Sequence, residues 1–247
     1  MRRIGLLGGT SWESSADYYR LLNLGAQTRL GGTHSADLLL RSVDFAEVEA
    51  KQVVDDWIGL GRRYASEAAA LVEAGADVLG ICANTMHLLY DDVAGAGAPV
   101  VHVVDAVADA AVALGVTRVG LLGTRYTMAS AELYPARMGA RGIDVVVPDA
   151  DDAAEVNRII YDELVLGQVL PASAERLRGI IARLVDSGAQ GVVLGCTELG
   201  MIVQPELSAV PLLDSLALHV DALLDAALAP GAPSSLPDNT PLEEGAA

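Results

Sequence analysis

The chain has 247 residues, of which 52% are hydrophobic, and its formal net charge is −17. This much apolar sequence can form one large hydrophobic core or two smaller ones. The negative charge repels nucleic acid and anionic lipid, and no apolar run reaches the ~18 residues of a transmembrane helix, so neither nucleic acid nor a membrane is expected as a partner.

Short apolar runs alternate with helical stretches along the chain, and this alternation predicts an α/β fold with parallel strands. Gly75, Gly115 and Gly188 each follow a predicted helix, where a left-handed residue commonly ends the helix. In chain order, the predicted strands cover residues 3–7, 36–40, 78–81, 100–104, 118–122, 144–147, 192–194 and 210–213, and predicted helices include 64–74, 106–114 and 174–187.

The order of motifs repeats once along the chain. The run Gly5-Leu6-Leu7-Gly8 recurs as Gly120-Leu121-Leu122-Gly123. A cysteine follows each copy: Cys82 lies 77 positions after Gly5, and Cys196 lies 76 positions after Gly120. We therefore predict two similar parallel-sheet α/β domains related by pseudo-two-fold symmetry, with the active site in the cleft between them.

The repeat also sets the expected domain boundaries. The N-terminal half should span residues 1–105, joined by a C-terminal helix at 215–228, and the C-terminal half should span residues 106–214. Prolines and small residues predict disorder over 229–247.

The first strand does not resemble a signal peptide, so we expect a cytoplasmic protein whose cysteines are not in a disulfide.

Two aspartates hold matching places in the repeat. Asp105 and Asp214 each end a strand that follows a cysteine by some twenty positions. Both are expected to be N-caps of the helices that come next.

The two cysteines carry the main functional prediction. Each follows a buried strand, and backbone N–H groups at such a turn lower the pKa of a thiol. The pseudo-two-fold axis would place Cys82 and Cys196 opposite each other. Inverting an α-carbon needs a base on one face and an acid on the other, which a thiolate and a thiol supply. The alternative is that both cysteines are core residues.

The motifs around these cysteines resemble those of the aspartate/glutamate racemase family. The resemblance covers about residues 4–225 and includes a glycine turn at 8–14 and a second one at 123–128. Glutamate racemases carry His where this chain has Glu198, so it is more similar to the aspartate racemase branch. The cysteine motifs are Cys82-Ala83-Asn84-Thr85-Met86-His87 and Gly195-Cys196-Thr197-Glu198.

The family resemblance implies a fold, a mechanism and a set of site residues. It implies a two-base racemase of free amino acids that needs no cofactor and usually forms a homodimer, with Cys82 and Cys196 as the catalytic pair. The substrate is the expected small-molecule partner, and Glu198 could orient Cys196 or the substrate ammonium. Substrate-binding roles are implied for Ser11, Asn84, Thr85, Thr124 and Thr197.

The side-chain clamp of the family is incomplete in this chain. Aspartate-specific members place an Arg near the second strand and a Lys on a later helix. Here residues 42–50 contain no Arg, and Val165 stands where a Lys is expected. Gln52 and Arg125 are candidate replacements that could bind the substrate side chain. A wider substrate range, including glutamate and neutral amino acids, is therefore a hypothesis.

Cofactor and metal chemistry find little support in the sequence. Lys51, the only lysine, lies on a charged helical face, whereas an enzyme that uses pyridoxal phosphate needs a lysine for its Schiff base. His87 has no second ligand close in sequence, so no metal site is predicted, and it is expected near the cleft without a catalytic role. Two alternatives stay open: a maleate isomerase or arylmalonate decarboxylase of the same superfamily, or a non-catalytic protein that binds a small ligand.

Overall fold

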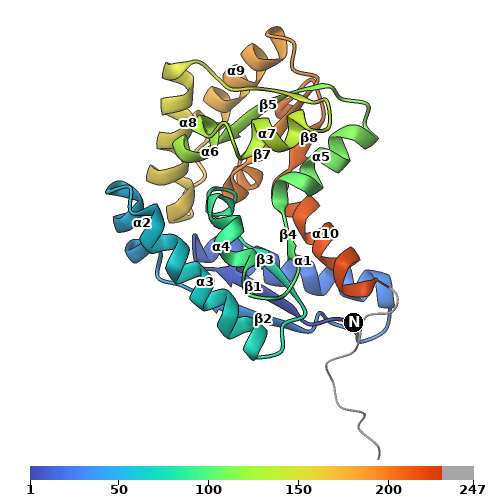
Figure 1. Cartoon of the computed structure of the whole chain (residues 1–247). Helices are drawn as coiled ribbons and strands as arrows, with labels where there is room; N and C mark the ends of the chain where they lie inside the picture. Colours follow the sequence, from blue (N-terminus) through green and yellow to red (C-terminus); the bar gives the residue numbers. More distant parts are fainter. Residues whose placement is uncertain (230–247) are drawn as a thin grey trace, which may run out of the picture.

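The computed structural model describes residues 1–229 and contains two parallel four-stranded sheets (Figure 1). The predicted disorder over 229–247 falls almost wholly outside the described residues. Both sheets have the same strand order, β2-β1-β3-β4 and β6-β5-β7-β8. The strands are β1 (Ile4–Gly8), β2 (Leu38–Ser42), β3 (Val78–Ile81), β4 (Val100–Val101), β5 (Arg118–Gly123), β6 (Asp144–Val146), β7 (Gly191–Gly195) and β8 (Leu212–Asp214).

These sheets confirm the predicted α/β class, and helices cover both faces of each. The α-helices are α1 (Trp12–Leu30), α2 (Phe45–Val53), α3 (Trp57–Glu73), α4 (Tyr90–Ala94), α5 (Val103–Ala113), α6 (Arg125–Ala129), α7 (Tyr134–Gly139), α8 (Ala150–Asp162), α9 (Pro171–Asp186) and α10 (Ser215–Leu228). The 3-10 helices are η1 (Thr85–Leu89), η2 (Leu164–Leu166), η3 (Thr197–Met201) and η4 (Pro205–Leu207). Within residues 1–229, no helix has both the length and the apolar character needed to cross a bilayer.

Glycines end three of the helices as predicted. Gly75, Gly115 and Gly188 have φ values of 95°, 68° and 97°, a region that side chains with a Cβ rarely adopt. Each turn sends the chain directly from a helix into the next strand of its sheet.

The chain crosses between the two halves near its end. Helix α10 packs its apolar face on α1 and β3 of the first half, where Leu216, Val220 and Leu223 join a buried cluster with Leu6 and Leu22. In Figure 1, α10 lies beside α1 in the lower part of the molecule and also packs against α5, which lies with the second half. The first half is thus built from residues at both ends of the described chain.

The predicted strand over residues 100–104 ends early. It stops at Val101, and α5 begins at Val103 because the His102 imidazole accepts a hydrogen bond from the backbone N–H of Val104 and caps the helix. The N-cap prediction for Asp105 is therefore wrong; its carboxylate pairs instead with Arg137 and Arg141.

The corresponding prediction for Asp214 is confirmed, because its carboxylate caps α10. Strand register explains the difference between the two aspartates. Leu79 pairs with Val100 and the equivalent Val192 pairs with Leu212, so the structural equivalent of Asp214 is His102.

Candidate active site

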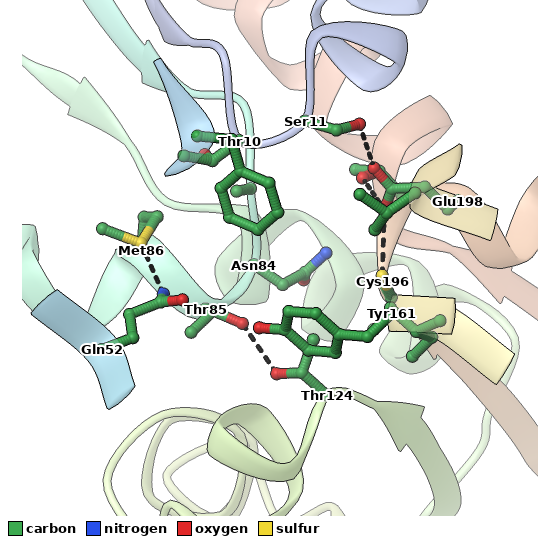
Figure 2. Close-up of a pocket in the computed structure, with 16 residues that line it drawn as sticks. Thr10, Ser11, Gln52, Asn84, Thr85, Met86, Thr124, Tyr161, Cys196 and Glu198 are labelled. Carbon is green, nitrogen blue, oxygen red and sulfur yellow. Dashed lines mark hydrogen bonds between the residues drawn. The ribbon is translucent and has the colours of Figure 1, made fainter. Parts of the chain in front are cut away.

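A pocket lies between the halves, at the carboxyl ends of β1, β3, β5 and β7 (Figure 2). This is the edge at which parallel sheets bind ligands. The lining residues are Thr10, Ser11, Phe45, Gln52, Ala83, Asn84, Thr85 and Met86 from the first half, and Thr124, Ile160, Tyr161, Val165, Gly195, Cys196, Thr197 and Glu198 from the second.

The carboxylate of Glu198 is the polar centre of the pocket. The Cys196 thiol donates a hydrogen bond to its Oε2 at 2.9 Å, and the Thr197 hydroxyl donates to the same oxygen at 2.8 Å. Its Oε1 accepts from the Ser11 hydroxyl of the other half at 2.6 Å. Glu198 is only 4% exposed, so these charge-assisted bonds replace the water that a carboxylate normally needs.

The thiol of Cys196 is held in its protonated form. Burial raises its pKa, and the neighbouring Glu198 carboxylate raises it further, because a thiolate there would face a second negative charge. The same contact places a proton acceptor on the sulfur. A proton that moves from Cys196 to Glu198 leaves a buried thiolate, which is a strong base because few water molecules can reach and stabilise its charge.

The two halves exchange equivalent hydrogen bonds across the pocket. Ser11 caps α1 and Thr124 caps α6, each at the carboxyl end of the first strand of its half. Ser11 donates to Glu198, and the Thr124 hydroxyl lies 2.8 Å from that of Thr85. Both contacts join an N-cap of one half to the turn after the third strand of the other.

Asn84 is fixed by two buried side chains. The Tyr134 hydroxyl donates to its Oδ1 at 2.6 Å, and its Nδ2 donates to Ser215 at 2.8 Å. Ser215 in turn donates to the carbonyl of Leu194 at 2.6 Å. This chain of bonds links the turn after β3 to β7 and leaves one Asn84 N–H available to a ligand.

The two cysteines are not structural equivalents. In the first half Leu7 pairs with Ile81, and in the second half the matching Leu122 pairs with Leu194. Cys82 is one position after Ile81, whereas Cys196 is two positions after Leu194. Successive side chains of a strand point to opposite faces, so this one-residue shift reverses the direction of the side chain. The equivalent of Cys196 is therefore Ala83.

The surroundings of Cys82 agree with this register. Cys82 is 0% exposed and packs with Tyr18 and Leu216 in the core beneath α10, whereas Ala83 lines the pocket. Burial raises the pKa of the Cys82 thiol. The prediction that two thiols face each other is therefore corrected: one thiol faces the pocket, and the other belongs to the core.

Of the two residues predicted to bind the substrate side chain, Gln52 lies in the pocket and Arg125 lies outside it. Gln52, only 3% exposed, lines the pocket, and its Oε1 has no hydrogen-bond partner among the described residues. In Figure 2, Gln52 and Met86 lie on the side away from Glu198. Arg125 does not reach this pocket, because its guanidinium lies over the ring of Tyr126 and donates to the Tyr126 hydroxyl. Val165 lines the wall where the family resemblance implied a lysine.

Sequence motifs did not reveal the apolar wall of the pocket. Phe45 of α2 and Tyr161 of α8 stack across the boundary between the halves, with ring centroids 6.4 Å apart. These two residues lie on separate helices with no shared motif, so only the fold brings them together. Their rings form an apolar part of the pocket lining.

Three buried histidines lie behind the pocket. The His87 Nδ1 donates to the carbonyl of Ala83 at 2.9 Å and so holds the turn that places Ala83, which gives it a positioning role outside the pocket. Burial lowers the pKa of His102 to about 3 and that of His219 to about 4, so both are neutral at neutral pH. Among residues 1–229, no three acidic, histidine or cysteine side chains form a group that could hold a metal ion.

The chain has two similar α/β halves, and a pocket between them holds a buried thiol and a buried carboxylate. These features define a class of bilobal proteins that act on a small molecule. Within that class, this chain belongs to the Asp/Glu/hydantoin racemase family, whose pattern is matched over residues 7–223. This match confirms the family resemblance drawn from the sequence motifs.

Solved structures of relatives agree with this assignment. A candidate Asp/Glu racemase from Yersinia pestis is 42% identical, with a TM-score of 0.86 over 92% of this chain and 100% of that one. An aspartate racemase homologue from Pyrococcus horikoshii is 34% identical, with a TM-score of 0.79 over 92% and 99% of the two chains. An aspartate racemase from Picrophilus torridus, at 20% identity and a TM-score of 0.69 over 92% and 94%, shares the fold.

Proposed function

We propose that this protein is an isomerase of the amino-acid racemase type that moves the α-proton of a free amino acid without pyridoxal phosphate. The observation that carries the proposal is the Cys196 thiol, which donates a hydrogen bond to Glu198 in a pocket closed by both halves. Membership of the racemase family and the similarity to two racemase-like structures support the same chemistry.

The proposed reaction begins with a proton transfer inside the enzyme. Glu198 accepts the proton of Cys196, and the thiolate then removes the α-hydrogen of the substrate. The electron pair left on the α-carbon delocalises into the substrate carboxylate. Donors around the pocket, namely the free N–H of Asn84 and the hydroxyl group of Thr85, stabilise that charge. Return of a proton to the α-carbon completes the cycle.

We further propose that neutral amino acids are better substrates than aspartate or glutamate. Of the described residues that line the pocket, none is a lysine, arginine or histidine. A second substrate carboxylate would be buried without a counter-charge, close to Glu198, which is costly. Gln52 instead offers an unpartnered amide oxygen to a neutral side chain that carries a hydrogen-bond donor.

The test is a panel of L- and D-amino acids incubated in deuterated water without added pyridoxal phosphate, with chiral analysis and deuterium at the α-carbon as readouts. We expect label in at least one neutral amino acid, loss of labelling in Cys196→Ser, and labelling retained in Cys82→Ala. Absence of label from every amino acid would contradict the proposed reaction. Faster labelling of aspartate than of any neutral amino acid would contradict the substrate preference.

A second candidate function follows from the single thiol in the pocket. Arylmalonate decarboxylases, which the sequence resembles at superfamily level, use one cysteine. Cys196 could equally protonate the carbanion that remains after a malonate-type substrate loses carbon dioxide. Release of carbon dioxide from phenylmalonate by the protein, with no α-exchange of amino acids, would favour this function over racemisation.

A further inference from the structure

The two walls of the pocket differ in their ability to carry a proton. Among residues 1–229, the ionisable side chains that line it, Tyr161, Cys196 and Glu198, all come from the second half. From the first half come hydroxyl, amide, aromatic, thioether and methyl groups, none of which ionises near neutral pH. This inventory of side chains is independent of the strand register.

The strand register shows which residues cause this difference between the two walls. Pairing of Leu7 with Ile81 and of Leu122 with Leu194 places Ala83 at the position that Cys196 holds in the other half. An ideal Cβ on Gly195, the equivalent of Cys82, would point at Leu121 and the carbonyl of Leu122, which are core atoms. A side chain at position 82 or at position 195 is thus directed away from the pocket.

We propose that the site is one-sided: Cys196 exchanges a proton at one face of the α-carbon, and the face toward Ala83 has no acid or base of its own. The proposal rests on the proposed function and adds a stereochemical consequence to it. Cys196 should act on the enantiomer whose α-hydrogen faces the second half. The hydrogen of the other enantiomer faces a methyl group and stays in place.

The proton balance of this site leads to exchange with retention. The thiolate of Cys196 takes the α-hydrogen, and the resulting thiol exchanges its proton with Glu198 and solvent. The same thiol then returns a solvent-derived proton to the same face, which regenerates the thiolate and the original enantiomer. Inversion requires water to deliver a proton from the Ala83 face, and this step lacks the contribution of about 100-fold that a positioned acid makes.

The experiment compares α-deuterium exchange and inversion, measured separately for each enantiomer of the best substrate in deuterated water. For the unaltered protein, we expect exchange of one enantiomer to exceed its inversion by about 100-fold, with little exchange of the other. Ala83→Cys should add the missing thiol, raise exchange of the second enantiomer by about 100-fold, and bring inversion close to exchange. Ala83→Val, which fills space without an exchangeable proton, should show neither gain.

The remaining outcomes separate the two proposals. If the unaltered protein exchanges and inverts both enantiomers at equal rates, and Ala83→Cys changes neither rate, another group serves the second face and the one-sided site is rejected. If no enantiomer of any amino acid exchanges its α-hydrogen in either the unaltered protein or Ala83→Cys, the proposed function itself is rejected, and the one-sided site with it. Making Ala83→Cys in a Cys82→Ala background excludes a contribution from the adjacent core thiol.

Discussion

The hydroxyl of Ser11 donates a 2.6 Å hydrogen bond to the carboxylate of Glu198, a residue 187 positions away in the other half. This contact joins the two halves at the polar centre of the pocket. It also orients the carboxylate so that its second oxygen faces the thiol of Cys196.

Glu198→Gln should lower the turnover number by about 100-fold or more, because an amide cannot accept the proton of Cys196 as a base. Steady-state kinetics with the best substrate from the amino-acid panel would measure the loss. Glu206→Gln is the matched control, since Glu206 is exposed and does not line the pocket. An unchanged turnover number in Glu198→Gln would show that Cys196 does not depend on this carboxylate.

Ser11→Ala should have a smaller effect on rate and a separate effect on stability. A hydrogen bond to a charged group contributes about 1.5–3 kcal/mol, so a loss of about 10- to 100-fold in kcat is expected. Removing the N-cap of α1 should also lower the unfolding free energy by about 1 kcal/mol. Urea denaturation and kinetics measure the two effects, and Ser11→Thr, which keeps a hydroxyl, should restore much of both.

Substitutions of Cys82 should separate stability from catalysis. Cys82→Ala removes one buried sulfur and should keep the catalytic rate with a modest loss of stability. Cys82→Ser should cost more, about 1–3 kcal/mol, because its hydroxyl is buried among apolar side chains. Urea denaturation and α-exchange assays distinguish the two effects. Loss of activity in a folded Cys82→Ala variant would show that the Cys82 thiol takes part in the reaction.

Val165→Lys should shift the substrate preference toward aspartate and glutamate. Val165 is half-buried in the pocket wall, so a lysine there can place its ammonium near the substrate side chain and remain partly hydrated. We expect kcat/KM for aspartate to rise about tenfold relative to a neutral amino acid, which corresponds to about 1.4 kcal/mol. Val169→Lys, at an exposed position, is the control and should leave the ratio unchanged.

Stability should decline as the pH falls from about 6.5 toward 4. The buried His219 accepts a hydrogen bond from Tyr18 and donates one to the carbonyl of Val101, and burial lowers its pKa from 6.5 to about 4. The unfolded chain therefore binds the proton more readily, so the contribution of His219 is present above pH 6.5 and is lost below it. The difference in pKa corresponds to roughly 3 kcal/mol.

Chemical denaturation across this pH range tests the expected role of His219. His219→Gln should be less stable at pH 7 and should lose stability less steeply as the pH falls. His34→Gln, a change of an exposed histidine, should reproduce the steep decline. Equal slopes in all three proteins would contradict the assignment.

The sequence was sufficient to predict the fold and most of the polar wall of the site. Repeated glycine turns and apolar runs are local signals, and they identified the duplicated halves as well as Ser11, Asn84, Thr124 and Glu198. The positions of the two cysteines relative to the pocket could not be predicted by counting residues from the glycine turns. From Gly5 to its partner Leu79 there are 74 positions, but only 72 from Gly120 to Val192, and this difference hides the shift of one residue between the cysteines. Register depends on the path of the loops, which no local motif specifies.

The return of α10 to the first half has a consequence for the order in which the protein can fold during synthesis. Leu6 and Leu22, made early, share their buried cluster with Leu216, Val220 and Leu223, which the ribosome adds after all the strands of the second half. The core of the second half, apart from its contacts with α10, can therefore pack while the first half still exposes apolar surface to solvent. A nascent chain that stalls before residue 215 would hold a second half that lacks only the α10 contacts and a first half whose core is unfinished, a state vulnerable to aggregation and proteolysis.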